Sequence, residues 1–239
     1  MESREEFVRS ERMLGSAAME RLSAARVAVF GVGGVGGHLT EALARAGVGA
    51  IDLFDHDCVS LSNINRQIVA LHSTVGKPKV EVMRERILDI NPACRVRTYQ
   101  DFYLPENADQ YPLDGYSYIA DAIDTVSAKI ELAVRAERAG IPIISAMGAG
   151  KRTDPTRFAV TDLFATSGCP LARVMRRELR ARDIKRLKVV ISDEPATQIR
   201  SDTATLEKGM REPPASLPFV PSVAGLIMAR EIVFDLIKD

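Results

Sequence analysis

The sequence has few cysteines, no excess charge of either sign and no long apolar run. Its three cysteines, Cys58, Cys94 and Cys169, are far apart and form no C-x-x-C pair, which excludes a structural zinc site of that form. A sparse and odd number of cysteines is typical of a reducing compartment. No apolar run is long enough to span a bilayer, and the N-terminal Met1-Glu2-Ser3-Arg4 does not resemble a secretory signal. We therefore expect a cytoplasmic protein without a membrane segment.

The net charge is zero, because 32 Lys and Arg residues balance 32 Asp and Glu residues. This balance argues against binding a polyanion over the whole surface, although a local basic cluster is still compatible with it. The length of 239 residues and the 46% apolar content suffice for one large domain with a substantial core. We predict a single domain over 1–239. It consists of an N-terminal helical segment (1–25), a nucleotide-binding core (26–163) and a C-terminal part (164–239) with a basic helix, a mobile loop over 194–217 and a last helix.

A glycine-rich turn follows the first apolar run. In Gly31-Val32-Gly33-Gly34-Val35-Gly36, three glycines fit the pattern G-x-G-x-x-G between a strand-like and a helix-like segment, which is the context that a nucleotide-binding turn needs. Gly31 permits the tight turn, Gly33 lets the backbone approach a phosphate, and Gly36 lets helix and strand pack closely. The alternative is a glycine-rich turn without a ligand, which the surrounding pattern makes less attractive.

Apolar runs alternate with helical patterns along most of the chain. Strands are predicted at 27–30, 50–55, 95–99, 116–123, 141–146, 157–163 and 188–192. Helices are predicted at 37–46, 77–90, 127–139, 171–188 and 223–238, the last one capped by Ser222. This alternation predicts an α/β fold with a doubly wound, mostly parallel sheet, a Rossmann-like ATP-binding half and a basic helical C-terminal insertion.

Polar and cationic residues follow the second predicted strand. Asp55 ends that strand, near the distance from the glycines at which an acid accepts hydrogen bonds from ribose hydroxyls. Asn63, Arg66, Gln67 and Lys79 come next. Fixed cations suit the phosphates of ATP, and a dinucleotide oxidoreductase would leave these residues unexplained. Asn63 is also a plausible helix cap, Lys77 is a rival to Lys79, and Asp57 is expected to be solvated or structural.

An acid at the end of the fourth predicted strand is a candidate ligand for a metal. Asp124 could hold Mg²⁺ bridging the ATP phosphates, since hard cations prefer carboxylate oxygens. Asp121 is a competitor three residues earlier, and in a strand the two would point to opposite faces. We choose Asp124 as the residue closer to the strand end.

The residues Gly31 to Gly36, Asp55, Ser62-Asn63, Arg66-Gln67, Lys79 and Asp124 resemble the ThiF/MoeB-like adenylating family, which includes the ubiquitin-activating enzymes. The resemblance extends to about Asp162. It implies that ATP and Mg²⁺ are bound, that Arg66, Lys79 and Asp124 act in catalysis, and that Lys79 is preferred over Lys77. It also implies a homodimer in which an N-terminal arginine of one protomer reaches the ATP of the other. We favour Arg12 over Arg9 for that role.

Four further stretches resemble the branch of this family that dehydrates threonylcarbamoyladenosine in tRNA. They are Asn63-Ile64-Asn65-Arg66-Gln67-Ile68, Ile90-Asn91-Pro92, the run from Tyr116 to Asp124, and the run from Phe219 to Gly225. The branch implies ATP-dependent cyclisation of the modified adenosine in the tRNA anticodon loop, and leaves a sulfur-transfer protein partner open. The main alternative is adenylation of the C-terminus of a ubiquitin-like sulfur carrier, against which the missing C-x-x-C pairs argue. An NAD-dependent oxidoreductase and a non-enzymatic nucleotide sensor are weaker alternatives.

The predicted helix over 171–188 is strongly basic. Its cations are Arg173, Arg176, Arg177, Arg180, Arg182, Lys185, Arg186 and Lys188, against only Glu178 and Asp183. This excess favours a phosphate backbone as partner, and the lack of aromatic residues argues against base stacking. The alternative is a solvated amphipathic face with Leu179, Ile184 and Leu187 turned inward.

Cys169 precedes this basic helix, in the region where some relatives carry a thioester-forming cysteine. No base stands near it in the sequence, and a cyclisation needs no enzyme thiol because the substrate carries its own nucleophile. Cys58 and Cys94 are expected to be buried thiols.

Overall fold

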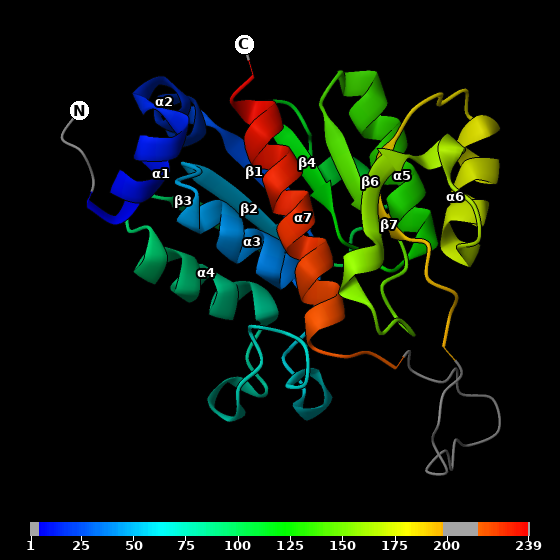
Figure 1. The fold of residues 1–239 in the computed structure, drawn as a ribbon, viewed down its shortest axis with the longest axis horizontal. Coiled ribbons are helices and arrows are strands. Elements are labelled where there is room, and N and C mark those ends of the chain that lie inside the picture. Colours follow the sequence, from blue (N-terminus) through cyan, green and yellow to red (C-terminus); the bar gives the residue numbers. More distant parts are fainter. Residues whose placement is uncertain (1–4, 198–214, 239) are drawn as a thin grey trace.

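A seven-stranded sheet forms the centre of the computed structural model, which describes residues 5–197 and 215–238 (Figure 1). The strands are β1 (Arg26–Phe30), β2 (Ala50–Phe54), β3 (Arg95–Tyr99), β4 (Tyr118–Asp121), β5 (Ile143–Ala146), β6 (Phe158–Asp162) and β7 (Lys188–Ser192). Their spatial order is β3-β2-β1-β4-β5-β7-β6, and every neighbouring pair is parallel except β6 with β7. The predicted doubly wound, mostly parallel sheet is confirmed. The strand order reverses between β1 and β4, which is where such sheets bind ligands.

Helices cover both faces of the sheet, which explains why the central strands are buried along nearly their whole length. One face carries α3 (Gly36–Arg45), α4 (Lys79–Ile90) and α7 (Phe219–Leu236), which share a core with the strands. The other face carries α5 (Val126–Ala139), α6 (Pro170–Arg180) and the segment 101–117. The start of α3 packs closely against Gly225 of α7. A Cβ added at Gly225 would come within 2.3 Å of the Val35 carbonyl oxygen, so only glycine allows this approach.

The predicted N-terminal helical segment is two helices. They are α1 (Val8–Leu14) and α2 (Ser16–Ala24), separated by Gly15 with a φ of 86°. Phe7 and Leu22 are buried, as expected of residues that dock the segment on the domain. Only Ala25 separates α2 from β1, so this segment lies at the amino end of β1 (Figure 1). The glycine turn follows the carboxyl end of the same strand, at the opposite edge of the sheet.

Two helix boundaries differ from the prediction by more than two residues. The basic helix ends at Arg180 and not at residue 188, because Asp183 adopts a left-handed φ of 60° and the Ile184 N–H donates to the Leu179 carbonyl. The last helix begins at Phe219, so Ser222 is not its cap but lies inside it and donates its hydroxyl to the Pro218 carbonyl.

Of the loop predicted over 194–217, residues 198–214 lie outside the described part of the chain. No helix within 5–197 or 215–238 combines the length and the apolar character that a membrane crossing requires.

Candidate nucleotide-binding site

A cavity of about 350 Å³ opens beyond the carboxyl ends of β1, β2, β3 and β4. It therefore lies at the point where the strand order reverses. Nine of the predicted site residues line it together: Gly31, Gly33, Gly34, Asp55, Asn63, Arg66, Gln67, Lys79 and Asp124. Two predicted residues, Gly36 and Arg12, do not line it.

The glycines of the turn stand in different steric surroundings. Gly31 has a φ of 88°, and a Cβ there would meet the Ala122 carbonyl oxygen at 2.7 Å. Gly36 faces the fold itself, since its Cβ would come within 1.7 Å of the Gly31 carbonyl oxygen. At Gly33 the nearest atom to an added Cβ is Nε2 of Gln67, at an ordinary 3.8 Å. The protein itself therefore leaves room for a side chain at position 33, on the wall of the cavity.

The Asp55 carboxylate is held in a fixed orientation at the end of β2. Its Oδ2 accepts a hydrogen bond from the Val32 N–H at 2.7 Å, and its Oδ1 accepts one from the Asp57 N–H at 2.9 Å. An ionised carboxylate can accept about four hydrogen bonds, so its remaining lone pairs are available to the cavity. This arrangement is compatible with the predicted contact to ribose hydroxyls.

Lys79 is the first residue of α4 and is nearly buried, with 4% of its surface exposed. Its Nζ lies 2.6 Å from Oδ2 of Asp57. Asp57 is thus not merely solvated: its carboxylate compensates the charge of a lysine and lines the same cavity. Lys77, the rival in the sequence, is exposed and does not line the cavity.

Asn63, Arg66 and Gln67 lie on the connection between β2 and α4. Asn63 is a cap as well as a cavity residue, because its Oδ1 accepts the Ser60 N–H at 3.1 Å. Arg66 Nη1 donates to the Ser62 carbonyl at 3.0 Å and to Asn65 Oδ1 at 2.9 Å. Gln67 is 7% exposed, and its Oε1 has no hydrogen-bond partner among the described residues. A buried amide oxygen without a donor is costly, which is consistent with a ligand or water at this wall.

β4 ends earlier than predicted, and this changes the positions of its two acids. Asp121 is the last strand residue and is fully buried, whereas Asp124 lies in the following turn, is exposed and lines the cavity. Asp55, His56 and Asp57 also place potential metal-ligand atoms within 4.8 Å of one another. However, Asp55 already accepts two backbone N–H groups and Asp57 pairs with Lys79. Asp124 is an exposed carboxylate on the cavity wall, which is compatible with the predicted ligand for a hard cation.

An aromatic wall was missed in the sequence. The cavity is also lined by Phe30, Phe54, Phe102 and Tyr103. The Phe30 and Phe54 rings stack with centroids 4.2 Å apart, and Tyr103 meets Phe30 edge-on at 4.9 Å. Burial raises the pKa of the Tyr103 hydroxyl, so this residue stays neutral. Phe102 is the exposed ring of this wall, at 38%, and is the one that a planar base could contact, whereas the other three rings are buried. The signal for residues 101–103 was their position directly after β3.

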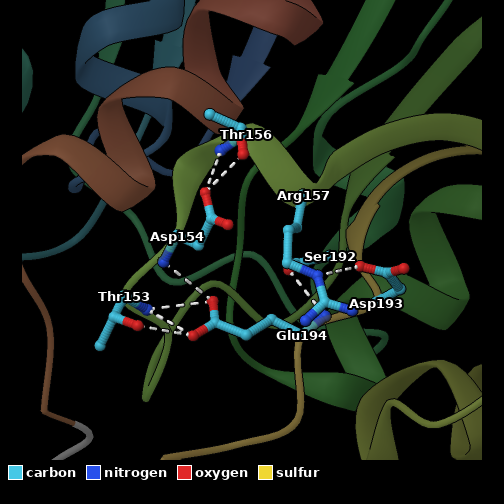
Figure 2. A network of polar contacts seen from close by, with 7 residues as sticks. All are labelled: Thr153, Asp154, Thr156, Arg157, Ser192, Asp193 and Glu194. Carbon is cyan, nitrogen blue, oxygen red and sulfur yellow. Dashed lines mark hydrogen bonds and ion pairs between the residues drawn. The ribbon is translucent and has the colours of Figure 1, made fainter.

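The turn after β5 closes the cavity on another side, through Ala149 and Gly150. Glu194, which follows β7, fixes the next part of this turn (Figure 2). Its carboxylate accepts the Thr153 N–H at 3.0 Å, the Thr153 hydroxyl at 2.7 Å and the Asp154 N–H at 3.0 Å. The hydrogen bonds from Thr153 lower the pKa of Glu194, so the acid remains ionised and the turn stays tied to the sheet.

The three cysteines and Arg12 lie away from the cavity lining. Cys169 is 3% exposed and packs in an apolar cluster, so its thiol is not accessible. Cys94 is buried as predicted, whereas the prediction for Cys58 is wrong because this residue is exposed. Arg12 is exposed on α1, and this chain's own cavity does not include it.

The basic segment over 173–188 presents its cations to solvent and its apolar residues to the core. Leu179, Ile184 and Leu187 are buried, as the amphipathic alternative required. Arg177 and Arg182 share Glu178, and Lys188 pairs with Asp235 and Glu231. In the described part of the chain, four exposed cations of the segment carry no salt bridge: Arg173, Arg180, Lys185 and Arg186. None of these four cations lines the cavity.

Comparison with known proteins agrees with this geometry. The model of the ThiF family matches residues 8–238. The chain is 46% identical over 243 residues to a tRNA threonylcarbamoyladenosine dehydratase of Bacillus subtilis (strain 168), covering 98% of this chain and 95% of that protein. Its fold is similar to crystal structures of the E. coli tRNA N6-threonylcarbamoyladenosine dehydratase in complex with AMP (TM-score 0.89, 38% identity) and with ATP (TM-score 0.88, 37% identity). Each of these two likenesses covers 98% of this chain and 94% of the other.

Proposed function

This chain belongs to the ThiF family, and on that premise we propose that it is an ATP-dependent dehydratase of threonylcarbamoyladenosine in tRNA. The observation that carries the proposal is the convergence of the glycine turn, Asp55, Arg66, Lys79 and Asp124 on one cavity. The near full-length likeness to dehydratases of this kind supports it. The chain has no C-x-x-C pair, which argues against the sulfur-carrier alternative.

The reaction begins with adenylation of the threonyl carboxylate. A carboxylate oxygen attacks the α-phosphorus of ATP, the bond to the β-phosphate oxygen breaks, and pyrophosphate leaves. A nucleophile within the same modification then attacks the activated carbonyl carbon and AMP departs, so the modified base loses one water. Because both reacting groups belong to one bound nucleoside, ring closure is effectively unimolecular.

Different residues of the cavity bind the nucleotide and stabilise the charge that develops in the reaction. Asp55 accepts hydrogen bonds from the ribose hydroxyls, and the backbone at Gly33 and Gly34 approaches the phosphates. Arg66 and Lys79 offset the negative charge that develops at the α-phosphorus. Asp124 would hold the magnesium ion, which would neutralise charge on the phosphates when bound. The fit of this ion rests on the exposed Asp124 carboxylate at the cavity wall, since hard cations prefer carboxylate oxygens.

The thiol of Cys169 has no part in the reaction. Its 3% exposure prevents attack on an activated substrate. The substrate supplies the ring-closing nucleophile itself, so no covalent enzyme intermediate is needed.

The tRNA is held by its phosphate backbone on the basic segment. Arg173, Lys185 and Arg186 supply exposed cations, and the segment 173–188 contains no aromatic residue for base stacking. Because a tRNA extends far beyond the modified nucleoside, contacts outside the cavity are expected. A tRNA substrate also agrees with a cytoplasmic location.

A homodimer completes the site. Arg12 of one protomer is proposed to reach the ATP of its partner, with Arg9 as the rival, since neither lines its own cavity. A sulfur-transfer protein partner stays an open part of the proposal. Sedimentation of mixed wild-type and Arg12→Ala protomers, together with their activity, tests the dimer.

Conversion of ATP to AMP by the purified protein tests the function. The substrates are tRNA carrying threonylcarbamoyladenosine and unmodified tRNA, and the nucleosides are then analysed by mass spectrometry. We expect AMP only with the modified tRNA, together with loss of one water from the modified base. Asp124→Asn should reduce the rate and raise the magnesium requirement. AMP formation with a sulfur-carrier protein, and none with the modified tRNA, would favour the alternative.

A further inference from the structure

A buried ion pair lies beneath the turn that carries Asp124. Nζ of Lys129 is 2.8 Å from Oδ2 of Asp121, and neither side chain has any exposed surface. The ammonium has three N–H groups, yet no described residue accepts a hydrogen bond from it beyond this ion pair. The predicted site did not include this pair, and the proposed reaction does not use it.

The ion pair closes the β4–α5 connection into a loop. Asp121 is the last residue of β4, and Lys129 lies in the first turn of α5, which begins at Val126. Residues 122–125 connect β4 to α5, and all four line the cavity. The pair therefore joins the two ends of the turn that presents Asp124.

The Asp121 carboxylate also holds the turn directly. Its Oδ1 accepts the Ile123 N–H at 3.2 Å, and its Oδ2 accepts the Ser145 hydroxyl at 2.5 Å. Ser145 is the register partner of Asp121 on β5, so the carboxylate is fixed from the neighbouring strand as well. On the other side, the Ala122 carbonyl lies against the turn at Gly31, where a Cβ would approach it to 2.7 Å. The connection is thus held at both ends and along its length.

Stability alone does not account for this pair. Removing two charges from water is costly, and a buried ion pair is often no more stable than a neutral pair of similar volume. A contribution to the position of a functional turn gives a reason for charges here.

We propose that Asp121 and Lys129 form a clamp that positions the turn 122–125 and thereby sets the affinity of Asp124 for the divalent cation. They are positioning residues, because neither lines the cavity. The positioning of the turn 122–125 is a property of the protein without ligand. The effect on the affinity for the cation rests on the proposed function.

The test compares two double variants that each neutralise one ion pair. The first is Asp121→Asn with Lys129→Met. The control is Asp52→Asn with Arg26→Met, which removes the pair of Arg26 Nη2 and Asp52 Oδ2, 2.5 Å apart. Arg26 is the first residue of β1 and Asp52 the third residue of β2, so this pair lies away from the cavity at the carboxyl ends of the strands. Hydrogen exchange of the unliganded proteins is measured at amides 122–125, and ATP binding is titrated with magnesium.

We expect amides 122–125 to exchange at least about tenfold faster in the first variant only, and its half-saturating magnesium concentration to rise about tenfold or more. Lys129→Arg as a single variant, which keeps the charge, should keep both values close to those of the wild type. If the first double variant does not fold, Ser145→Ala removes one hydrogen bond to Asp121 and should give a shift of about threefold in the same direction.

Equal exchange and equal magnesium dependence in the first variant and the wild type would overturn the proposal. So would equal changes in both double variants, which would indicate a loss of stability without a positional role. If the wild-type protein binds no ATP with magnesium, the proposed function fails, and hydrogen exchange still decides whether the clamp holds the turn.

Discussion

Replacement of Gly33 by alanine tests whether this glycine is needed for ATP binding and not for folding. An added Cβ would meet no atom closer than 3.8 Å, and φ at this position lies outside the left-handed region. Folding should therefore tolerate Gly33→Ala. ATP binding should not, because the methyl group would stand between the backbone and the phosphate that is proposed to approach it.

The size of both effects can be estimated. A tolerated glycine-to-alanine change raises the free energy of unfolding by about 0.4–1 kcal/mol, through the lower entropy of the unfolded chain. Loss of one hydrogen bond between the backbone and a charged phosphate weakens binding by about 1.5–3 kcal/mol. Since every 1.4 kcal/mol is about tenfold in affinity, the dissociation constant for ATP should rise about 10- to 100-fold.

Thermal unfolding and calorimetric titration with ATP measure the two effects on the same samples. Gly148→Ala is the matched control, since its Cβ would also have ordinary space, 3.7 Å from Sγ of Cys169, and it does not line the cavity. Gly36→Ala should destabilise the fold, because its Cβ would come within 1.7 Å of a carbonyl oxygen. If Gly33→Ala binds ATP as tightly as the wild type, the phosphates do not approach this backbone and the assignment of the turn is refuted.

Three further predictions concern charged residues. Lys79→Ala should lower the rate of AMP formation about 100-fold or more, whereas Lys77→Ala should change it less than about twofold, and rates comparable in the two variants would contradict the choice of Lys79. Burial alone would raise the pKa of Asp235, but hydrogen bonds, first of all from Lys188, outweigh it and hold the pKa at about 2, below the ordinary 3.8. Because this pKa is lowered by folding, the stabilisation is complete above about pH 4 and is lost as the pH falls towards 2, so the melting temperature of Asp235→Asn should depend less on pH in that window than the wild type does. Arg173→Ala should weaken tRNA binding and reduce the slope of log affinity against log salt concentration by about 1, and an unchanged slope would place the tRNA elsewhere.

Much of the site could be predicted because it depends on local sequence. The glycine turn, Asp55 and Lys79 follow strands or begin helices, and parallel strands bring their carboxyl ends to one edge. The aromatic wall could not be predicted in the same way, because Phe30 and Phe54 look like ordinary core residues until the strands pair and place them side by side. The partner of Lys79 was likewise unforeseen, since burial of a lysine is decided by packing.

The sequence by itself determined the order of strands and helices, the nucleotide-binding turn and the likeness to a family. These features are encoded in spacing within short windows, where backbone geometry and side-chain periodicity act. The sequence already favoured Asp124 over Asp121 as the acid that faces the cavity, but only the tertiary structure gave the physical basis for that difference. β4 ends at Asp121, and that residue is buried with Lys129 and Ser145 while Asp124 is left in the open turn. The physical reason is that the ion pair between Asp121 and Lys129 forms only when α5 packs back onto the sheet. That packing depends on contacts between elements and cannot be predicted from a local sequence pattern.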